Sequence, residues 1–424
     1  MKSGNHIHTW MMKNKRIILL LVGNLIAFLI VLQELKAQDV QGYIYGKVTT
    51  VDRKVYQGRL RWGNEEAFWH NYFNAAKTGE SKHDQYRVKS SKKDFDWENF
   101  NWDFSSIWSD NISSNHQFTC QFGDIKTIEN VRRSYVDLTL KNGMTYHLSG
   151  QGYNDVGAEI QVYDEELGRI DIDWDRIDKV DFLPTPRTLN IKESAPIYGK
   201  VETLRKGTFV GYIQWDHDER VGDDKLDGDI EDGTDVSFPF NQIKSIARYR
   251  NGSDVELKNG RKLYLVGSND VNSENRGIIV DVPGMGRVDI PWKYFEQVTF
   301  ETPKTSGQSY ASYAAPKGLN GKVITLRNEE ISGKIIYDLD EEWEIETLDA
   351  KDDDVEYEVT LRHVKRIIPR NYAYSQVELR SGEMLLLGDA RDVDSHNDGL
   401  LIFRSRDDRG QYVKWEEIAE IIFD

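Results

Sequence analysis

Cysteine is nearly absent from this chain, because Cys120 is the only one among 424 residues. That count excludes both an intrachain disulfide and a cysteine-based zinc site. Cys120 falls in the apolar column of an expected strand, which favours an inert buried thiol over a reactive one.

The usual catalytic signatures are also missing. The sequence contains no G-x-S-x-G, no H-E-x-x-H, no phosphate-binding loop and no dinucleotide fingerprint. None of the nine histidines recurs at a matching position in the internal repeats of the chain. We therefore expect a protein that is not an enzyme and that has no cofactor and no metal site.

Basic residues are outnumbered, since 55 Lys and Arg stand against 71 Asp and Glu, for a formal net charge of -16. Residues 1–37 hold five basic residues and one acidic residue, so the rest of the chain carries -20. A chain this acidic repels the phosphates of nucleic acids and of anionic lipids. Neither is expected as a general partner.

Long apolar runs are limited to one. Residues 17–32 are predominantly apolar, a basic stretch ending at Arg16 precedes them, and Ala37 supplies a small residue for cleavage. That order predicts a secretory signal peptide over 1–37 and a periplasmic or extracellular mature protein. An uncleaved N-terminal membrane anchor is the alternative, because the run is nearly long enough to span a bilayer. With no second run, no membrane insertion of the mature chain is expected.

What the chain does contain is one short apolar pattern that occurs six times. Its clearest copy is Val288-Asp289-Ile290-Pro291-Trp292, followed by Phe295. The first three apolar residues alternate as in a half-buried strand, and the step of three fits one tight helical turn before the next strand. Aligning the copies gives columns of apolar residues, and we expect these columns to face the core. Their members include Ile125, Trp174, Phe240, Ile243, Trp292, Val298, Leu361, Trp415 and Phe423.

Longer stretches of the chain also match one another. Residues 46–75, 199–228 and 321–350 align without a gap, each beginning Gly-Lys-Val-x-Thr. The parts that follow align through an Asn-Gly or Ser-Gly pair that suits a hairpin turn. This similarity predicts three tandem repeats and two linkers rich in proline or serine. The repeats are 38–182, 197–300 and 318–424, and the linkers are 183–196 and 301–317.

Each repeat is itself double. In the second repeat, Val201 and Phe209 of the first half parallel Val255 and Leu263 of the second half. Each half reads as a hairpin, an acidic turn, two further strands, one helical turn and a fifth strand. That order resembles the small SH3-like or Sm-like β-barrel. The resemblance implies an all-β fold in which each repeat is a fused pair of five-stranded barrels, and Sm-type RNA binding is not carried over because the chain is acidic.

The first repeat alone contains an insertion, residues 76–117, with six aromatic residues in its second part. Exposed, these rings would offer a stacking surface for a sugar or anchors for a protein partner. Folded back, they would cover an edge strand or fill a groove. We predict that any ligand or partner contact centres on the insertion and on the acidic turn beside it: Glu65, Glu66, Trp69, His70, Phe95, Trp97, Trp102 and Trp108.

Paired acids follow a Trp or Tyr column in every repeat, as Glu65-Glu66, Asp218-Glu219 and Asp340-Glu341. Adjacent carboxylates can bind calcium or act as acid and base. Neighbouring strand residues point to opposite faces, however, so a solvated turn whose carboxylates cap backbone amides is favoured. A second acidic column is expected to fix turns in the same way, and its members are Asp155, Asp270 and Asp392.

Three functions remain open on this basis. The first is an exported, non-catalytic scaffold or binding protein of the bacterial cell envelope, whose partner is a protein or glycan of that envelope. The second is a carbohydrate-binding accessory protein that uses the aromatic insertion. The third is a hydrolase that uses the repeated carboxylates, and the missing catalytic motifs leave it with the least support.

Overall fold

The computed structural model describes residues 39–78, 116–132, 134–189, 195–405 and 410–424. In this part of the chain strands carry the fold, and every helix is a three-residue 3-10 turn. The expected all-β class is confirmed. The predicted signal peptide and the insertion aromatics lie outside the described residues.

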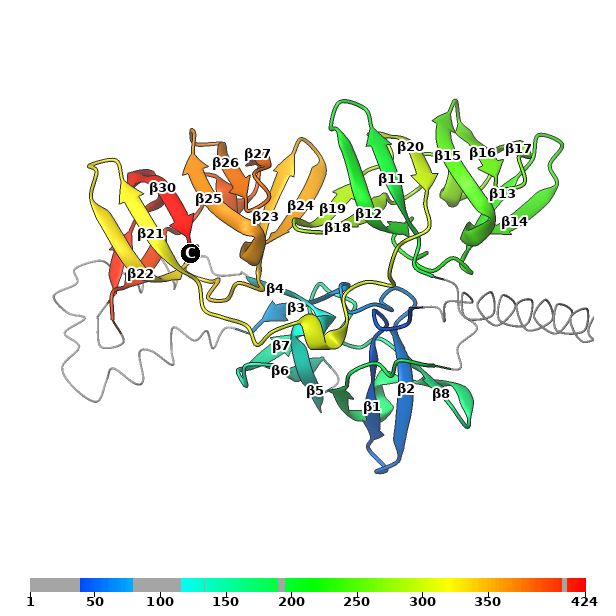
Figure 1. The fold of residues 1–424 in the computed structure, drawn as a ribbon, viewed down its shortest axis with the longest axis horizontal. Helices are drawn as coiled ribbons and strands as arrows, with labels where there is room; N and C mark the ends of the chain where they lie inside the picture. The colour runs from blue at the N-terminus through cyan, green and yellow to red at the C-terminus, as the bar shows by residue number, and fades with distance from the viewer. Residues whose placement is uncertain (1–38, 79–115, 133, 190–194, 406–409) are drawn as a thin grey trace, which may run out of the picture.

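The strands fall into three segments, which are named segment 1 (39–182), segment 2 (197–300) and segment 3 (318–424). Figure 1 shows segments 2 and 3 side by side, with segment 1 packed across their junction. Among the described residues each segment contributes ten strands. A threefold duplication with independent domains stays a prediction from the sequence.

Segment 1 contains β1 (Tyr45–Thr50), β2 (Val55–Trp62), β3 (Tyr72–Lys77), β4 (His116–Gln121), η1 (Phe122–Asp124), β5 (Ile125–Arg132), β6 (Tyr135–Leu140), β7 (Thr145–Ser149), β8 (Ile160–Asp164), β9 (Gly168–Ile172), η2 (Trp174–Arg176) and β10 (Ile177–Phe182). Segment 2 contains β11 (Tyr198–Thr203), β12 (Thr208–Trp215), β13 (Lys225–Asp229), β14 (Asp235–Pro239), η3 (Phe240–Gln242), β15 (Ile243–Tyr249), β16 (Gly252–Leu257), β17 (Lys262–Leu265), η4 (Asn269–Val271), β18 (Ile278–Val282), β19 (Gly286–Ile290) and β20 (Phe295–Phe300).

After the turn η5 (Tyr310–Ser312), segment 3 contains β21 (Asn320–Thr325), β22 (Glu330–Ile336), β23 (Thr347–Asp352), β24 (Val355–Thr360), η6 (Leu361–His363), β25 (Val364–Pro369), β26 (Tyr374–Leu379), β27 (Met384–Gly388), η7 (Arg391–Val393), β28 (Leu400–Phe403), β29 (Gln411–Val413), η8 (Trp415–Glu417) and β30 (Ile418–Phe423).

Strand pairing follows one scheme in all three segments. In segment 1, β1 pairs with β2 and β10, β2 pairs with β8, and β8 pairs with β9. The other five strands pair as β5–β6–β7–β3–β4. The two groups join where β5 pairs with β10, and the corresponding joins are β15–β20 and β25–β30. In segment 2 the contact of β13 with β17 is reduced to one bridge, Asp229 to Val266.

These groups are not the consecutive halves that the sequence analysis expected. Each group combines the hairpin of one half with the last three strands of the other half, as β1–β2 do with β8, β9 and β10. The expected order of strands within a group is kept, but the partners are exchanged. Because both halves carry the same apolar pattern, either hairpin fits either set of strands, and periodicity alone cannot choose between them.

Segments 2 and 3 share a sheet, because β19 pairs with β24 from Gly286 opposite Val359 to Asp289 opposite Glu356. Gly286 has φ of 148°, and a Cβ there would lie 2.1 Å from the carbonyl oxygen of Glu358. A residue without a side chain is therefore required for the two strands to approach. Nothing in the sequence marks this seam. Among the described residues, the first strands β1, β11 and β21 pair only within their own segments, as expected.

The predicted inward columns are confirmed, since all nine residues are buried, from Ile125 at 0% exposed to Trp292 at 7%. In five of the six copies of the apolar pattern the turn is a 3-10 helix, closed by a backbone bond such as Ile177 N–H to Trp174 C=O. The sixth, at Trp292, is a hydrogen-bonded turn rather than the expected helical one. The turn lets a large side chain enter the core just before the next strand begins.

The stretch 301–317 packs on segment 1. Tyr310 and Tyr313 are buried in the segment 1 core, and the Tyr310 hydroxyl donates to the carbonyl oxygen of Ile125 at 2.8 Å. Lys141 donates through Nζ to the carbonyl oxygens of both tyrosines, at 2.5 and 3.0 Å. The linker is therefore held against segment 1 by two aromatic rings that pack in its core.

Candidate functional site

The second acidic column, Asp155, Asp270 and Asp392, has the same structural task in every segment. In segment 1, Trp62 Nε1 donates to the carbonyl oxygen of Asp155 at 2.8 Å, while Asp155 Oδ2 accepts from the amide of Asn74 at 2.7 Å. Trp215, Asp270 and Asp227 repeat this arrangement in segment 2, at 2.9 and 2.7 Å. Tyr337, Asp392 and Asp349 repeat it in segment 3. Each aspartate thus ties the two strand groups of its segment together.

In segments 1 and 3 the second acid of the pair differs from the expected solvated turn. Glu66 is 4% exposed and Glu341 is 8% exposed, because the turn folds these side chains inward. Burial, together with the charge of Asp155, raises the pKa of Glu66 well above its usual range. Burial also raises the pKa of Asp155 to about 7. Burial accounts for both shifts because it removes the water that stabilises a carboxylate.

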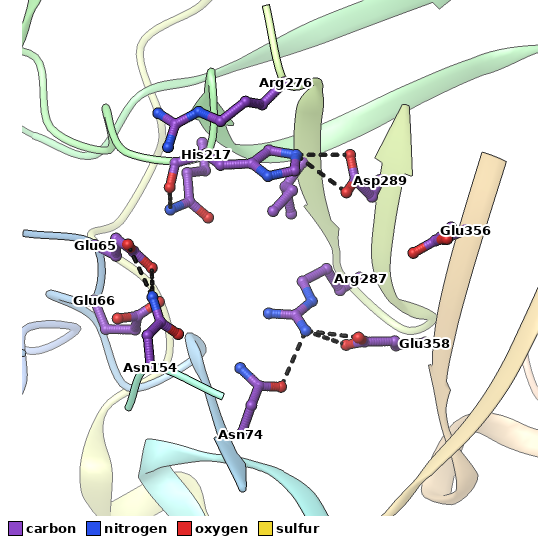
Figure 2. Close-up of a pocket in the computed structure, with 12 residues that line it drawn as sticks. Glu65, Glu66, Asn74, Asn154, His217, Arg276, Arg287, Asp289, Glu356 and Glu358 are labelled. Atoms are coloured by element: carbon purple, nitrogen blue, oxygen red, sulfur yellow. Dashed lines mark hydrogen bonds and ion pairs between the residues drawn. The ribbon is translucent and has the colours of Figure 1, made fainter. Parts of the chain in front are cut away.

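A polar pocket of about 340 Å³ lies where the three segments meet. Figure 2 shows its labelled side chains arranged around an open space. Segment 1 supplies one wall, segment 2 the opposite wall and segment 3 the edge near β24. The lining residues are Glu65, Glu66, Asn74, Asn154, Gln214, His217, Arg276, Ile279, Arg287, Asp289, Glu356 and Glu358.

Most charges in the pocket are held by a neighbour. Arg287 contacts Glu358 and donates to Asn74 Oδ1 at 3.1 Å, which places its guanidinium at the meeting point of all three segments. His217 Nε2 lies 3.1 Å from both carboxylate oxygens of Asp289. These contacts fix the side chains in place before any ligand arrives, which lowers the entropic cost of binding.

Glu66 is different from its charged neighbours in the pocket. Its carboxyl group makes no hydrogen bond or ion pair with the described residues, although it is almost completely buried. Arg220 and Arg287 are close enough to oppose the rise in its pKa, yet neither donates to it. Because Glu66 lines the pocket and no neighbour occupies its carboxyl group, a hydroxyl of a ligand could bond to it there.

The pocket opens into a second polar cavity of about 640 Å³. The two cavities share Asn74, Asn154, Arg287, Glu356 and Glu358. The larger cavity adds Gln117, Gly152 and Tyr153, so one aromatic side chain borders the combined space. Together they are large enough for a ligand of more than one ring.

The predicted site residues are separated by the fold. Glu65 and Glu66 line the pocket. Trp69, in contrast, is fully buried, with Nε1 donating to Thr185 Oγ1 at 3.0 Å and its ring packed on Tyr310, so it is a core residue and not a contact residue. Phe95, Trp97, Trp102 and Trp108 lie outside the described residues.

His70 is 7% exposed and stacks between Phe68 and Tyr212. It lines another cavity, of about 230 Å³, and burial lowers its pKa to about 3. The predicted contact surface places His70 beside Glu65 and Glu66, whereas the structure places His70 on a different cavity. Glu65 and Glu66 line one cavity and His70 lines the other, so neighbours in sequence face different spaces.

Sequence reasoning missed the pocket residues of segments 2 and 3, among them His217, Arg287 and Glu358. Arg287 corresponds in the repeat alignment to Arg169, and nothing in either local sequence marks one as a pocket residue. The signal lies in the packing of whole segments. Asn74 and Arg287 are more than 200 positions apart in the sequence, and they come into contact because the segments pack against one another.

The chain matches no family model, no curated protein and no solved structure. Within the part of the chain that the structure describes, no helix is long and apolar enough to cross a membrane. What the pocket can bind follows from its own geometry and charge.

Proposed function

We propose that this chain is an exported, non-catalytic binding protein of the bacterial cell envelope, and that a neutral, hydroxyl-rich ligand such as an envelope glycan occupies the pocket between the segments. The observation that carries the proposal is the buried carboxyl group of Glu66, which faces the pocket without a partner. A pocket walled by three segments also gives a ligand contacts on several sides.

The charge and hydrogen-bonding groups of the pocket favour hydroxyl groups over other chemistry. Five carboxylates line it against two arginines and one histidine, so a phosphate or another anion would be repelled. A hydroxyl can donate to a carboxyl oxygen such as those of Glu66 and accept from an amide or guanidinium such as Arg287. An apolar ligand would leave these groups without partners, which costs binding free energy.

Binding is favoured over hydrolysis because the pocket residue Glu66 and its neighbour Asp155 form a carboxyl pair that is not special to this pocket. Glu66 with Asp155 has counterparts in Glu219 with Asp270 and in Glu341 with Asp392. All three aspartates accept a backbone amide, and burial is the largest cause of the raised pKa in each. A pair that recurs with one structural duty is weak support for acid–base catalysis. The hydrolase alternative predicts turnover that Glu66→Gln abolishes.

Calorimetric titration of the mature chain, residues 38–424, with neutral oligosaccharides tests the proposal. Suitable probes are chitooligosaccharides, cello-oligosaccharides and dextran oligomers. Glu66→Gln replaces one carboxyl oxygen, which ligand hydroxyls would donate to, with an amide group that cannot accept, and we expect it to weaken binding about tenfold or more. Glu219→Gln is the matched control, because it changes the equivalent acid of segment 2, which lies outside the pocket. Equal affinities for both variants and the wild type would refute the assignment of this pocket.

The carbohydrate-binding accessory function of the insertion is a separate prediction. Its test is deletion of residues 81–115, with Trp97→Ala and Trp102→Ala together as the milder change. Loss of glycan binding in these variants, with Glu66→Gln unaffected, would move the contact from the pocket to the insertion. Loss in Glu66→Gln, with the deletion unaffected, would place the contact in the pocket.

A further inference from the structure

We propose that segment 3 contains a cation site, in which Asp338, Glu341 and Asp392 bind one divalent ion of the calcium class. This site is distinct from the polar pocket and does not depend on the function proposed for it. One ligand oxygen from each of the three side chains lies within 4.8 Å of the other two. Two oxygens that each lie ~2.4 Å from a calcium ion can be at most ~4.8 Å apart, so one ion can contact all three.

The backbone holds the three residues in place. Asp338 follows β22, and its Oδ1 accepts the amide of Asp398. Glu341 lies on the tight turn closed by backbone bonds to Tyr337, both 2.9 Å long. Asp392 is in η7 and uses Oδ2 to accept the amide of Asp349 at 2.6 Å. The ligand atoms thus come from three fixed points of the same segment.

Glu341 points to a missing partner. The residue is 8% exposed, and its Oε2 is buried without any hydrogen-bond partner. It lines a cavity of about 190 Å³ together with Asp338 and Asp392. In a buried site an oxygen without a donor is expected to be matched by water, a proton or a cation. Because two more carboxylates converge on the same point, a cation satisfies the most groups at once.

The charges around the cavity leave room for a divalent ion. Lys77 of segment 1 reaches in, but it contacts Asp340 at 3.0 Å and Glu346 at 2.7 Å. Arg391 contacts Asp338 at 2.8 Å and also Asp398. Three carboxylates on the cavity have no cationic side chain in contact among the described residues, and these are Glu341, Asp349 and Asp392. A bound ion would supply the missing positive charge.

The other two segments do not assemble the same group of oxygens. In segment 1 the position of Asp338 is Gly63, so one ligand is lost. In segment 2 it is Asp216, which accepts from Asn269 and from the guanidinium of Arg276 at 3.2 Å. Within the described residues, only segment 3 brings three such groups together. The site is thus a departure from the shared architecture.

Oxygen donors select a hard cation, and the carboxylates leave calcium and magnesium as the main choices. Magnesium requires near-ideal octahedral geometry at ~2.0–2.1 Å and keeps most of its waters, whereas calcium tolerates irregular sets of six to eight oxygens. Three carboxylates at unequal backbone positions form an irregular set. The site is therefore expected to prefer calcium over magnesium.

Terbium luminescence on the mature chain, residues 38–424, tests the site, because the Tyr337 hydroxyl donates to the Asp392 carbonyl oxygen and so places a sensitising ring beside the ion. We expect sensitised emission that calcium displaces and magnesium does not, at one ion per chain. Glu341→Gln should weaken calcium binding about tenfold or more, while the matched control Glu219→Gln keeps wild-type affinity.

A second readout uses the wild type and one further variant, in case Glu341→Gln does not fold. Calcium should raise the thermal unfolding midpoint of the chelator-treated wild type, and Asp392→Asn should lose that rise. Absence of calcium binding to the wild type up to ~10 mM, at the weak end of extracellular calcium modules, would overturn the proposal. Equal binding by the wild type and both segment 3 variants would overturn it as well.

Discussion

Arg287 of β19 contacts both carboxylate oxygens of Glu358 of β24, at 2.6 and 2.5 Å, across the seam between segments 2 and 3. Both side chains are mostly buried, at 14% and 20% exposed. The same guanidinium donates to Asn74 of segment 1. One arginine therefore links all three segments at the wall of the polar pocket.

Removing this arginine should destabilise the chain. Arg287→Ala leaves Glu358 as a mostly buried carboxylate without its partner, a change that costs about 3–5 kcal/mol in the free energy of unfolding. Arg169→Ala is the matched control, because Arg169 occupies the same position in β9 but is 53% exposed and pairs with Asp171 at the surface. The control should cost less than about 1 kcal/mol. The free energies of unfolding of both variants can be measured by urea denaturation. Equal urea midpoints for Arg287→Ala and Arg169→Ala would contradict the role given to Arg287.

A core prediction concerns Trp292, which is 7% exposed and packs against Trp215 and Phe295 with ring centroids 6.1 and 5.1 Å apart. Trp292→Ala removes a large ring from a packed core and should cost about 3–5 kcal/mol in the free energy of unfolding. Urea denaturation followed by circular dichroism measures the cost. An unchanged midpoint would show that the ring is not part of the core.

The local parts of this fold could be read from the sequence because their cause is local. Alternating apolar residues and steps of three place Trp174, Trp292 and Trp415 in the core without reference to the rest of the chain. The exchange of hairpins between the two halves of a segment could not be predicted from the sequence, because both halves have the same apolar pattern. The seam at Gly286 and the meeting of Asn74 with Arg287 depend on how segments pack, which has no sequence period. The same reason explains why Glu66 was identified for the site while Arg287 and Glu358 were not.

The pH dependence of stability should reflect Asp155. Burial raises its pKa in the folded chain to about 7, above the value of an unfolded aspartate. The folded chain therefore holds the proton more tightly, so the stability this group contributes is fully present below about pH 4 and is lost as the pH rises through about 7.

Asp155→Asn removes this titration and keeps an oxygen that can accept the amide of Asn74. The variant should thus show a smaller loss of stability than the wild type between pH 4 and pH 8, by on the order of a few kcal/mol in the free energy of unfolding. Urea midpoints measured across that range test the difference. Parallel profiles for variant and wild type would mean that Asp155 does not titrate with a raised pKa.

The seam between β19 and β24 depends on Gly286. Gly286→Ala places a methyl group where only 2.1 Å separates its carbon from the Glu358 carbonyl oxygen, so the strands must part. Gly168→Ala is the matched control at the equivalent position of β9, which also has a positive φ of 77° but no atom within 4 Å of an added Cβ. Both variants carry the backbone strain of a side chain at positive φ, about 1 kcal/mol, and only the first carries the clash. Hydrogen exchange should therefore show lost amide protection in β24 for Gly286→Ala and not for Gly168→Ala. Unchanged protection of β24 in both variants would mean that segments 2 and 3 are not joined through this pair of strands.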